Sequence, residues 1–364
     1  MKRKRALWLA VSLTFGASLA SADNITFTCD PNVAAATCNY LNTTVAGNYT
    51  STFTNANADF YIQYGTTGLA SSTTGTDNQV TYSHYAAALA AAAAASGNPV
   101  QIDAVAALNS FDASVYGTGN VDITSALANA LGISGDVIGG ITGTTAGGSM
   151  CSNPDTVGCY NGIITVTNDP TIALYYDNLG GPEPSDAFDY YNTVEHEVDE
   201  LLGTVSCVTT QTSPLTNDCP GNPPSAVDLF RYSGPGALVL DKTLSTTPGA
   251  YFSYDGGVTN GATTNIGVKF YNTLDNGDDY ADFVTNCSGG PGSFSVQDAE
   301  GCPGTDGGLN ITNDGGAEIN MLNAVGYELA PSSSSVPEPR TFFLLVPVLL
   351  LGAYFARRRY RLAA

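Results

Sequence analysis

The most informative segment of the chain runs from Asp186 to Gly203 and reads Asp-Ala-Phe-Asp-Tyr-Tyr-Asn-Thr-Val-Glu-His-Glu-Val-Asp-Glu-Leu-Leu-Gly. Ser185 or Asp186 can cap its start, and Gly203 can take the left-handed conformation just past its end. These signals predict a helix of about four turns. At about 100° per residue, its apolar side chains share one face. They are Phe188, Tyr191, Val194, Val198, Leu201 and Leu202.

The opposite face of this predicted helix presents Asp189, His196 and Glu200. His196 and Glu200 are four residues apart and stand one turn above the other, where they can bind one cation together. Glu197 projects from the edge of the same face. In the HExxH helix of zinc proteases, side chains at i and i+4 hold the metal and the Glu after the first ligand is the general base. Glu200 occupies the second ligand position, and a carboxylate can also bind zinc, iron or manganese.

The charge balance limits the partners of the protein. The chain has 364 residues, 33 of them acidic and 12 basic, and a net charge of -21. This excludes nucleic acid as a partner, because phosphate binding needs clustered Lys and Arg. Hydrophobic residues make up 43%, which is enough for a folded core. Since so acidic a chain can also present a solvated carboxylate face without any metal, the helix alone leaves both interpretations open.

The N-terminus has the composition of an export signal. Four basic residues, 2–5, precede an apolar run over 6–20, and Ala20-Ser21-Ala22 has the small-x-small pattern of a cleavage site. We therefore expect a signal peptide over residues 1–22 and an exported mature protein.

The C-terminus combines a Ser-rich linker at 331–336, Pro337-Glu338-Pro339, an apolar run over 341–356 and an Arg-rich end. This order resembles the PEP-CTERM sorting signal of Gram-negative bacteria, over residues 337–364. The resemblance implies a short transmembrane helix in the inner membrane, processing by an exosortase, and delivery to the cell envelope or the extracellular surface. A plain tail anchor is the alternative.

Eight cysteines in an exported chain should be oxidised. A preference for short loops pairs neighbours along the sequence, although other connectivities stay open. The expected pairs are Cys29 with Cys38, Cys151 with Cys159, Cys207 with Cys219, and Cys287 with Cys302.

Other segments have weaker secondary-structure signals. We expect a helix over 85–95, capped by Ser83 and ended by Gly97, and a short helix over 125–131. Strands are expected over 59–64, 162–167 and 172–176. The acidic cluster at 275–279 is typical of a solvated turn, with a structural Ca²⁺ ion as the alternative.

Two motifs together suggest a family. The segment 194–203, followed by Asp228-Leu229-Phe230-Arg231-Tyr232-Ser233, resembles a family of secreted zincin-type metalloproteases found in PEP-CTERM-bearing bacteria. Further segments match in order between residues 59 and 329, namely 251–257, 277–283, 296–299 and 322–327. The resemblance implies an α+β, zincin-like domain over 23–330, with an active-site helix, a Zn²⁺ ion and a disulfide-stapled, loop-rich C-terminal part.

The second of these motifs supplies three more candidate site residues. Asp228 could be the third metal ligand beside His196 and Glu200. Arg231 could pair with a ligand carboxylate or polarise a substrate carbonyl, and a structural salt bridge is the alternative. Tyr232 could hydrogen-bond the oxyanion, or it could belong to the core.

The expected function is a secreted or surface-anchored, metal-dependent endopeptidase that cleaves a peptide or protein substrate. His196, Glu200 and Asp228 would hold the metal, Glu197 would activate water, and Arg231 and Tyr232 would assist. The alternative is a non-catalytic surface or biofilm-matrix protein on a degenerate zincin scaffold.

Overall fold

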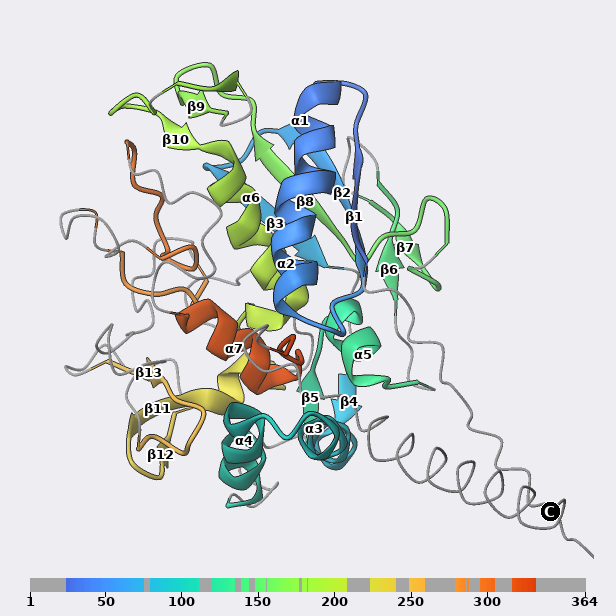
Figure 1. Ribbon diagram of the computed structural model, residues 1–364, viewed down its shortest axis with the longest axis vertical. Helices are drawn as coiled ribbons and strands as arrows, with labels where there is room; N and C mark the ends of the chain where they lie inside the picture. Colours follow the sequence, from blue (N-terminus) through green and yellow to red (C-terminus); the bar gives the residue numbers. More distant parts are fainter. Residues whose placement is uncertain are drawn as a thin grey trace, which may run out of the picture. The chain divides into compact units, whose positions relative to one another are not determined.

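A four-stranded sheet forms the upper half of the fold in the computed structural model (Figure 1). The described residues are 24–74, 79–110, 119–134, 139–143, 148–154, 156–176, 179–181, 183–207, 223–239, 249–258, 279–285, 287, 295–304 and 316–331. The predicted signal peptide, the sorting signal and all but the first residue of the Ser-rich linker lie outside them. Among the residues described, no helix is both long and apolar enough to cross a membrane.

The sheet has the strand order β1 (Ile25–Cys29), β2 (Ala58–Gly65), β8 (Gly162–Thr167) and β3 (Ala70–Thr74). The first three strands are parallel, and β3 runs antiparallel to β8. Aromatic and β-branched side chains favour these strands. The strands predicted over 59–64 and 162–167 are confirmed, because they form β2 and β8.

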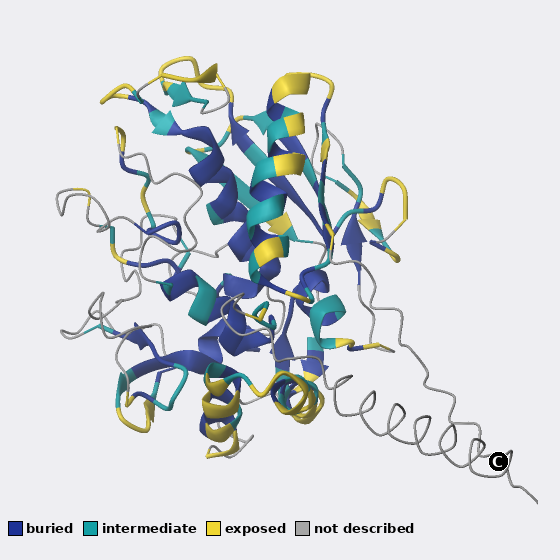
Figure 2. Cartoon of the chain, in the orientation of Figure 1, coloured by how far each residue is buried: buried dark blue, intermediate teal, exposed yellow. Residues whose placement is uncertain are grey.

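Two helical segments lie side by side against this sheet (Figure 1). The first joins β1 to β2 and consists of α1 (Ala35–Tyr40), a π-helical stretch (Leu41–Val45) and α2 (Ala46–Thr52). The second is α6 (Tyr190–Asp199), which packs on β8 and β3. Between the two segments, the ring centroids of Tyr40 and Tyr191 lie 4.4 Å apart. Figure 2 shows that α6 is buried along its length, whereas α1 and α2 alternate between buried and exposed residues.

The remaining helices pack beyond the end of α6 in Figure 1. They are α3 (Tyr82–Ser96), α4 (Pro99–Asn109), α5 (Ser125–Leu131) and α7 (Ala317–Val325). Thr81 caps α3 in place of Ser83, because its hydroxyl oxygen accepts from the backbone N–H of His84, and Gly97 ends the helix in the left-handed conformation. The predicted helix over 125–131 is confirmed.

Short strands complete the architecture. They are β4 (Gln79–Thr81) with β5 (Asn120–Asp122), β6 (Gly140–Ile141) with β7 (Met150–Cys151), β9 (Leu174–Tyr175) with β10 (Phe188–Asp189), and β11 (Arg231–Gly234) between β12 (Ala237–Leu238) and β13 (Tyr251–Phe252). Of the strand predicted over 172–176, only β9 forms. The protein is therefore a mixed α+β protein with several small sheets.

Three of the predicted disulfides are present: Cys29–Cys38, Cys151–Cys159 and Cys287–Cys302. The fourth predicted pair includes Cys219, which lies outside the described residues. The preference for short loops thus selected the right partners for six cysteines.

Candidate metal centre

Helix α6 begins four residues later than the sequence suggests. Asp189 caps it, because its side-chain oxygen accepts from the backbone N–H groups of Tyr191 (2.7 Å) and Asn192 (3.0 Å). Neither Ser185 nor Asp186 is the cap, since the chain there is still approaching the short strand β10. Asp189 therefore belongs to the helix start and not to the face that carries His196.

The end of the helix departs from α geometry. A π-helical turn, Glu200–Thr204, follows α6 directly. Inside it Gly203 has φ 126°, a conformation that side chains disfavour. This confirms the expectation that Gly203 takes a positive φ at the end of the helix.

The apolar face of α6 is buried as its periodicity predicts, but an acidic face is buried as well. Glu195 and Asp199 are both 0% exposed. Asn48 donates to Glu195 Oε1 (3.2 Å), and the hydroxyl of Tyr49 donates to Asp199 Oδ1 (2.8 Å). Carboxylates are rarely buried unless they are paired, and α2 supplies these partners.

Three potential metal ligands converge beside α6. His196 Nε2 lies 3.7 Å from Glu200 Oε1 and 3.6 Å from Asp282 Oδ1. One ligand atom from each of the three residues lies within 4.8 Å of the others, and no other such group of three or more occurs among the described residues. His196 and Glu200 are thus brought together as the helix spacing predicts.

The orientation of the His196 ring is set by a backbone carbonyl. Nδ1 lies 2.8 Å from the oxygen of Val296. Because a carbonyl oxygen only accepts, Nδ1 must carry the proton, and in the neutral ring the lone pair is then on Nε2. Nε2 is the nitrogen that faces Glu200 and Asp282, so the tautomer suits metal binding.

The two carboxylates also have fixed partners. The hydroxyl of Ser72, in β3, donates to Glu200 Oε2 (2.5 Å). The side-chain amide of Gln297 donates to Asp282 Oδ1 (2.7 Å), and the backbone N–H of Asp279 donates to Oδ2 (3.1 Å). Every side chain of the cluster is therefore held by a neighbour, as the ligands of metal sites usually are.

The cluster carries an excess of negative charge. Burial lowers the pKa of His196, but Asp282, Glu200 and Glu197 outweigh it and raise that pKa well above its usual value. Burial raises the pKa of Glu200, but the neighbouring His196 and a hydrogen bond from Ser72 lower it below normal. Carboxylates packed around one imidazole favour a bound cation.

Glu197 is 5% exposed and lies between the two helix ligands in sequence. Burial, followed by repulsion from Glu200, raises its pKa well above the usual value. An elevated carboxyl pKa is typical of residues that exchange protons with a substrate. Glu197 is therefore a buried carboxyl group next in sequence to His196, and its role as general base stays a prediction.

Asp228 does not belong to the cluster. Its Oδ1 accepts from the hydroxyl of Ser206 (2.6 Å), and its Oδ2 accepts from the backbone N–H groups of Cys207 (2.8 Å) and Ser225 (2.9 Å). The expectation that Asp228 is the third ligand is therefore corrected. Its carboxylate instead holds the chain that follows α6, and Asp282 is the third residue of the cluster.

The structure places Arg231 in the interior of the protein. It is 3% exposed, and its Nη1 donates to the backbone carbonyl of Tyr280. Tyr280 precedes Asp282 by two residues, so the guanidinium supports the segment that carries the third candidate ligand.

Tyr232 is fully buried in β11, where it pairs with Tyr251 of β13. Burial, with smaller contributions from Tyr82 and Asp255, raises its pKa. These electrostatic neighbours lie outside the cluster. The core interpretation of Tyr232 fits this burial, and its role at an oxyanion stays a prediction.

The acidic cluster at 275–279, expected to be a solvated turn with a Ca²⁺ ion as the alternative, lies mostly outside the described residues, which include only Asp279. That carboxylate accepts from the backbone N–H groups of Ala281 (2.6 Å) and Ser206 (2.9 Å). Burial, then Asp282 and Glu200, raise its pKa well above normal. In the described part it therefore stabilises the turn that leads to Asp282.

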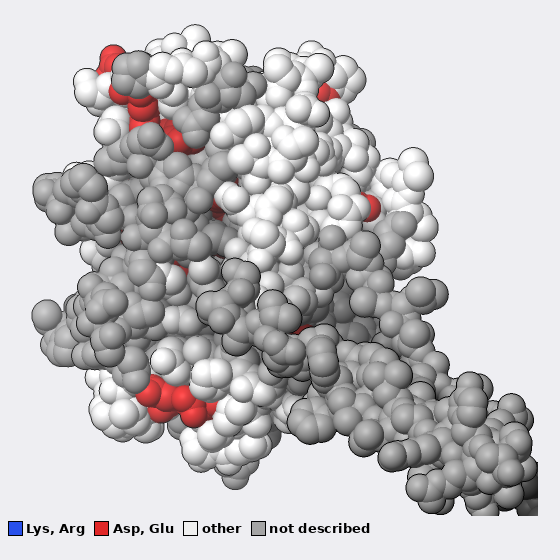
Figure 3. All heavy atoms as spheres, in the orientation of Figure 1, with Lys and Arg blue, Asp and Glu red and all other residues white. Residues whose placement is uncertain are grey.

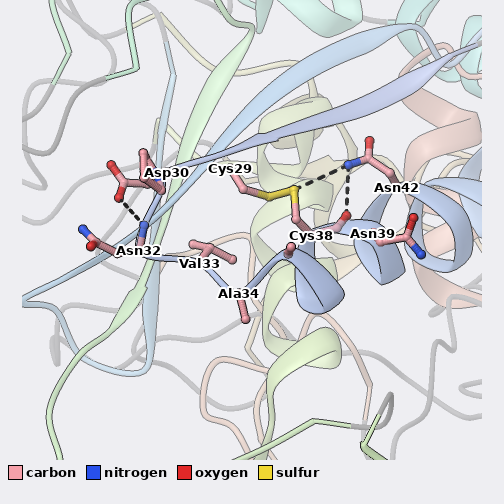
Figure 4. A pocket seen from close by; sticks show the side chains of 10 residues that line it. Cys29, Asp30, Asn32, Val33, Ala34, Cys38, Asn39 and Asn42 are labelled. Carbon is pink, nitrogen blue, oxygen red and sulfur yellow. Dashed lines mark hydrogen bonds between the residues drawn. A yellow bond between two sulfur atoms is a disulfide. The ribbon is translucent and has the colours of Figure 1, made fainter.

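An open pocket lies beside the start of α1 and is separate from the cluster in its lining residues (Figure 4). The Cys29–Cys38 disulfide forms part of its wall. Its Asp30 already accepts from the backbone N–H of Asn32 (2.9 Å) and the hydroxyl of Tyr61 (3.0 Å). We assign this pocket no part in the metal site.

Comparison of the chain with models of protein families, with curated proteins and with solved structures gives no match. Function must therefore be inferred from the geometry of the site. Asp282 lies in the segment 277–283, one of those that resemble the metalloprotease family, and this was the available signal for it. Its distance from His196 along the chain does not indicate a shared site.

Proposed function

We propose that the protein is a metal-dependent peptidase with a zincin-like domain. The observation that carries this proposal is the convergence of His196, Glu200 and Asp282 on one point beside the buried Glu197. Two of these residues and the general base come from one helix, and the third ligand comes from a distant segment.

The chemistry of the donors fits a divalent cation. One imidazole nitrogen and two carboxylates are ordinary ligands of Zn²⁺. Ligand atoms about 2.0–2.2 Å from a tetrahedral zinc ion lie about 3.3–3.6 Å from one another. His196 Nε2 stands 3.6 and 3.7 Å from the two carboxylate oxygens, so small side-chain movements would complete the site.

Glu197 would perform the proton transfers. A bound divalent cation would supply Lewis-acid activation of water and of the scissile carbonyl group. The Glu197 carboxylate would accept a proton from the attacking water and pass it to the leaving amine. Burial and repulsion from Glu200 raise its pKa, which would favour its holding the proton between the two transfers.

The position of β3 supports a peptide as the substrate. Among the described strands of the main sheet, β3 is at one edge, and its residues are half-buried or exposed. Its Ser72 contacts Glu200 directly. An extended peptide that adds to such an edge would run past the cluster.

The setting proposed for this activity is outside the inner membrane. Disulfides persist in oxidising compartments, which suits an exported protein. Figure 3 shows a face on which most described residues are uncharged and the charged ones are acidic. Export by the N-terminal signal and processing of the PEP-CTERM tail by an exosortase are part of the proposal.

The test combines metal content with peptidase activity. We expect the purified protein to bind one Zn²⁺ ion and to cleave unstructured protein substrates. Glu197→Gln should keep the metal and lose activity by several orders of magnitude, because the base is removed but the ligands are not. Chelation should lower the melting temperature, since a ligand bound only by the folded state stabilises it.

The outcomes separate the two candidate functions. Stoichiometric zinc without cleavage of any peptide would favour a non-catalytic surface protein on the same scaffold. A wild-type protein that binds no divalent metal would contradict the metal centre itself.

A further inference from the structure

Gln297 is a fully buried polar residue that faces the cluster from outside it. Its side-chain Nε2 donates to Asp282 Oδ1 (2.7 Å), and its Oε1 accepts from the hydroxyl of Thr204 (3.0 Å). Thr204 ends the π-helical turn that follows the metal helix. The amide therefore bridges the helix that carries two ligands and the segment that carries the third.

The direction of this amide is determined by its partners. An ionised carboxylate can only accept, so the NH₂ group of Gln297 must face Asp282. The hydroxyl of Thr204 can donate to the remaining carbonyl oxygen. The opposite orientation would place two acceptors against each other, so the carboxylate rotamer and the amide orientation stabilise one another.

The backbone around Gln297 is tied down at several points. Its N–H donates to Glu318 Oε1 in α7 (3.1 Å), and its carbonyl accepts from the N–H of Phe283 (2.7 Å). The N–H of Ala299 donates back to the carbonyl of Phe283 (2.9 Å). The Cys287–Cys302 disulfide joins the same two segments further along. These contacts hold the segment with Asp282 against the segment with Gln297.

The residue before Gln297 acts on another ligand. The carbonyl of Val296 sets the ring of His196, as described above. Two adjacent residues thus direct ligands that come from two different parts of the fold, His196 from α6 and Asp282 from the segment 279–285.

We propose that Gln297 is a positioning residue of the metal centre, whose amide holds Asp282 in the rotamer that binds the cation. The proposal rests on the metal site argued above. Asp282 Oδ1 has two lone pairs, one of which accepts the hydrogen bond from Gln297 while the other can face the cation. Without the amide, Asp282 gains rotamer freedom that metal binding must then remove.

The test compares Gln297→Met with a matched control. Methionine keeps the length and volume of glutamine and removes its donor. Gln63→Met is the control, because Gln63 is also a buried glutamine whose Nε2 donates to a side chain, Thr165 Oγ1 (3.0 Å), but it lies in β2 outside the cluster. Both variants are made in the full chain.

Metal binding is measured directly, without reliance on activity. Zn²⁺ affinity is obtained by competition with a chromophoric chelator, and Co²⁺ serves as a spectroscopic probe of ligand geometry. We expect Gln297→Met to weaken Zn²⁺ binding about 10- to 100-fold, the usual effect of losing an outer-shell partner. The Co²⁺ absorption bands should shift in this variant. Gln63→Met should keep wild-type affinity and spectrum, whatever its effect on stability.

The results distinguish failure of this proposal from failure of the proposed function. If the wild-type protein binds neither ion, the metal site is wrong. If it binds both and Gln297→Met has the same affinity and spectrum, the positioning role is wrong.

Should Gln297→Met not fold, Thr204→Val replaces it, since this change removes only the bond that orients the amide. We then expect a several-fold loss of affinity, and an unchanged affinity overturns the proposal.

Discussion

The ring of His196 lies 2.8 Å, measured from Nδ1, from the backbone oxygen of Val296, a residue 100 positions further along the chain. This contact leaves the lone pair of the neutral ring on Nε2, which faces Glu200 and Asp282. A helix alone could present the imidazole, but it could not select its tautomer. Which ring nitrogen of His196 carries the proton therefore depends on a segment that is far from α6 in the sequence.

The structure places Asp282, and not Asp228, beside His196 and Glu200. Asp282→Ala should reduce zinc affinity by more than the about 100-fold that outer-shell changes reach, because a ligand is lost. Asp228→Ala should leave three donors without an acceptor and lower the free energy of unfolding by about 1–3 kcal/mol per unpaired group. Chelator competition and urea unfolding measure the two effects. The reverse result would restore Asp228 as the ligand.

Arg231→Met tests whether the guanidinium is structural. Loss of its hydrogen bond to the carbonyl of Tyr280 should lower the free energy of unfolding by about 1–3 kcal/mol. The zinc affinity should fall with it, since the support of the segment carrying Asp282 is weakened. Unfolding curves and metal titrations measure these quantities. A variant with normal stability and affinity but a reduced kcat would instead indicate a role at the substrate.

Gly203→Ala tests whether the positive φ of Gly203, just after α6, is strained for a residue with a side chain. Its φ of 126° is unfavourable for alanine, and the new Cβ would lie 3.2 Å from Leu127 Cδ2. We expect a loss of about 3 kcal/mol in unfolding free energy. Gly132→Ala is the control, because Gly132 has φ 64° and open space around it, and should lose about 1 kcal/mol. Equal losses in the two variants would argue against strain at Gly203.

The Cys287–Cys302 disulfide should matter for metal binding as well as for stability. It closes a separation of 15 residues, so replacing both cysteines by serine should cost about 3 kcal/mol. Because it joins the segments of Asp282 and Gln297, zinc affinity should also fall. The matched variant replaces Cys29 and Cys38, which line the separate pocket, and should keep its affinity. Equal zinc affinities in both variants would show that the Cys287–Cys302 disulfide does not affect metal binding.

Local sequence signals predicted much of the fold. Strong helix formers and a terminal glycine predicted α3, and β-branched residues predicted β8. Short cysteine spacings predicted the three disulfides that the structure describes. The start of α6 was misplaced, because Ser185 and Asp186 can also cap a helix and Asp189 was assigned to the polar face of the helix.

The buried acidic face of α6 could not be anticipated in the same way. Helical periodicity separates apolar from polar positions, but it does not tell a solvated carboxylate from a buried one. Glu195 and Asp199 are buried because α2 presents Asn48 and Tyr49 to them. Such pairing is a property of the packed elements.

Helical spacing alone requires that His196 and Glu200 share one face, because the rise and turn of a helix relate residues four apart whatever surrounds them. That Asp282 joins them, and that Asp228 does not, follows from the tertiary structure alone. Contacts between distant segments depend on how the segments pack, and packing is the sum of many weak interactions along the whole chain. The pairing of the imidazole with the first carboxylate is therefore local, whereas the third candidate ligand, Asp282, and its contact with Gln297 are consequences of the fold.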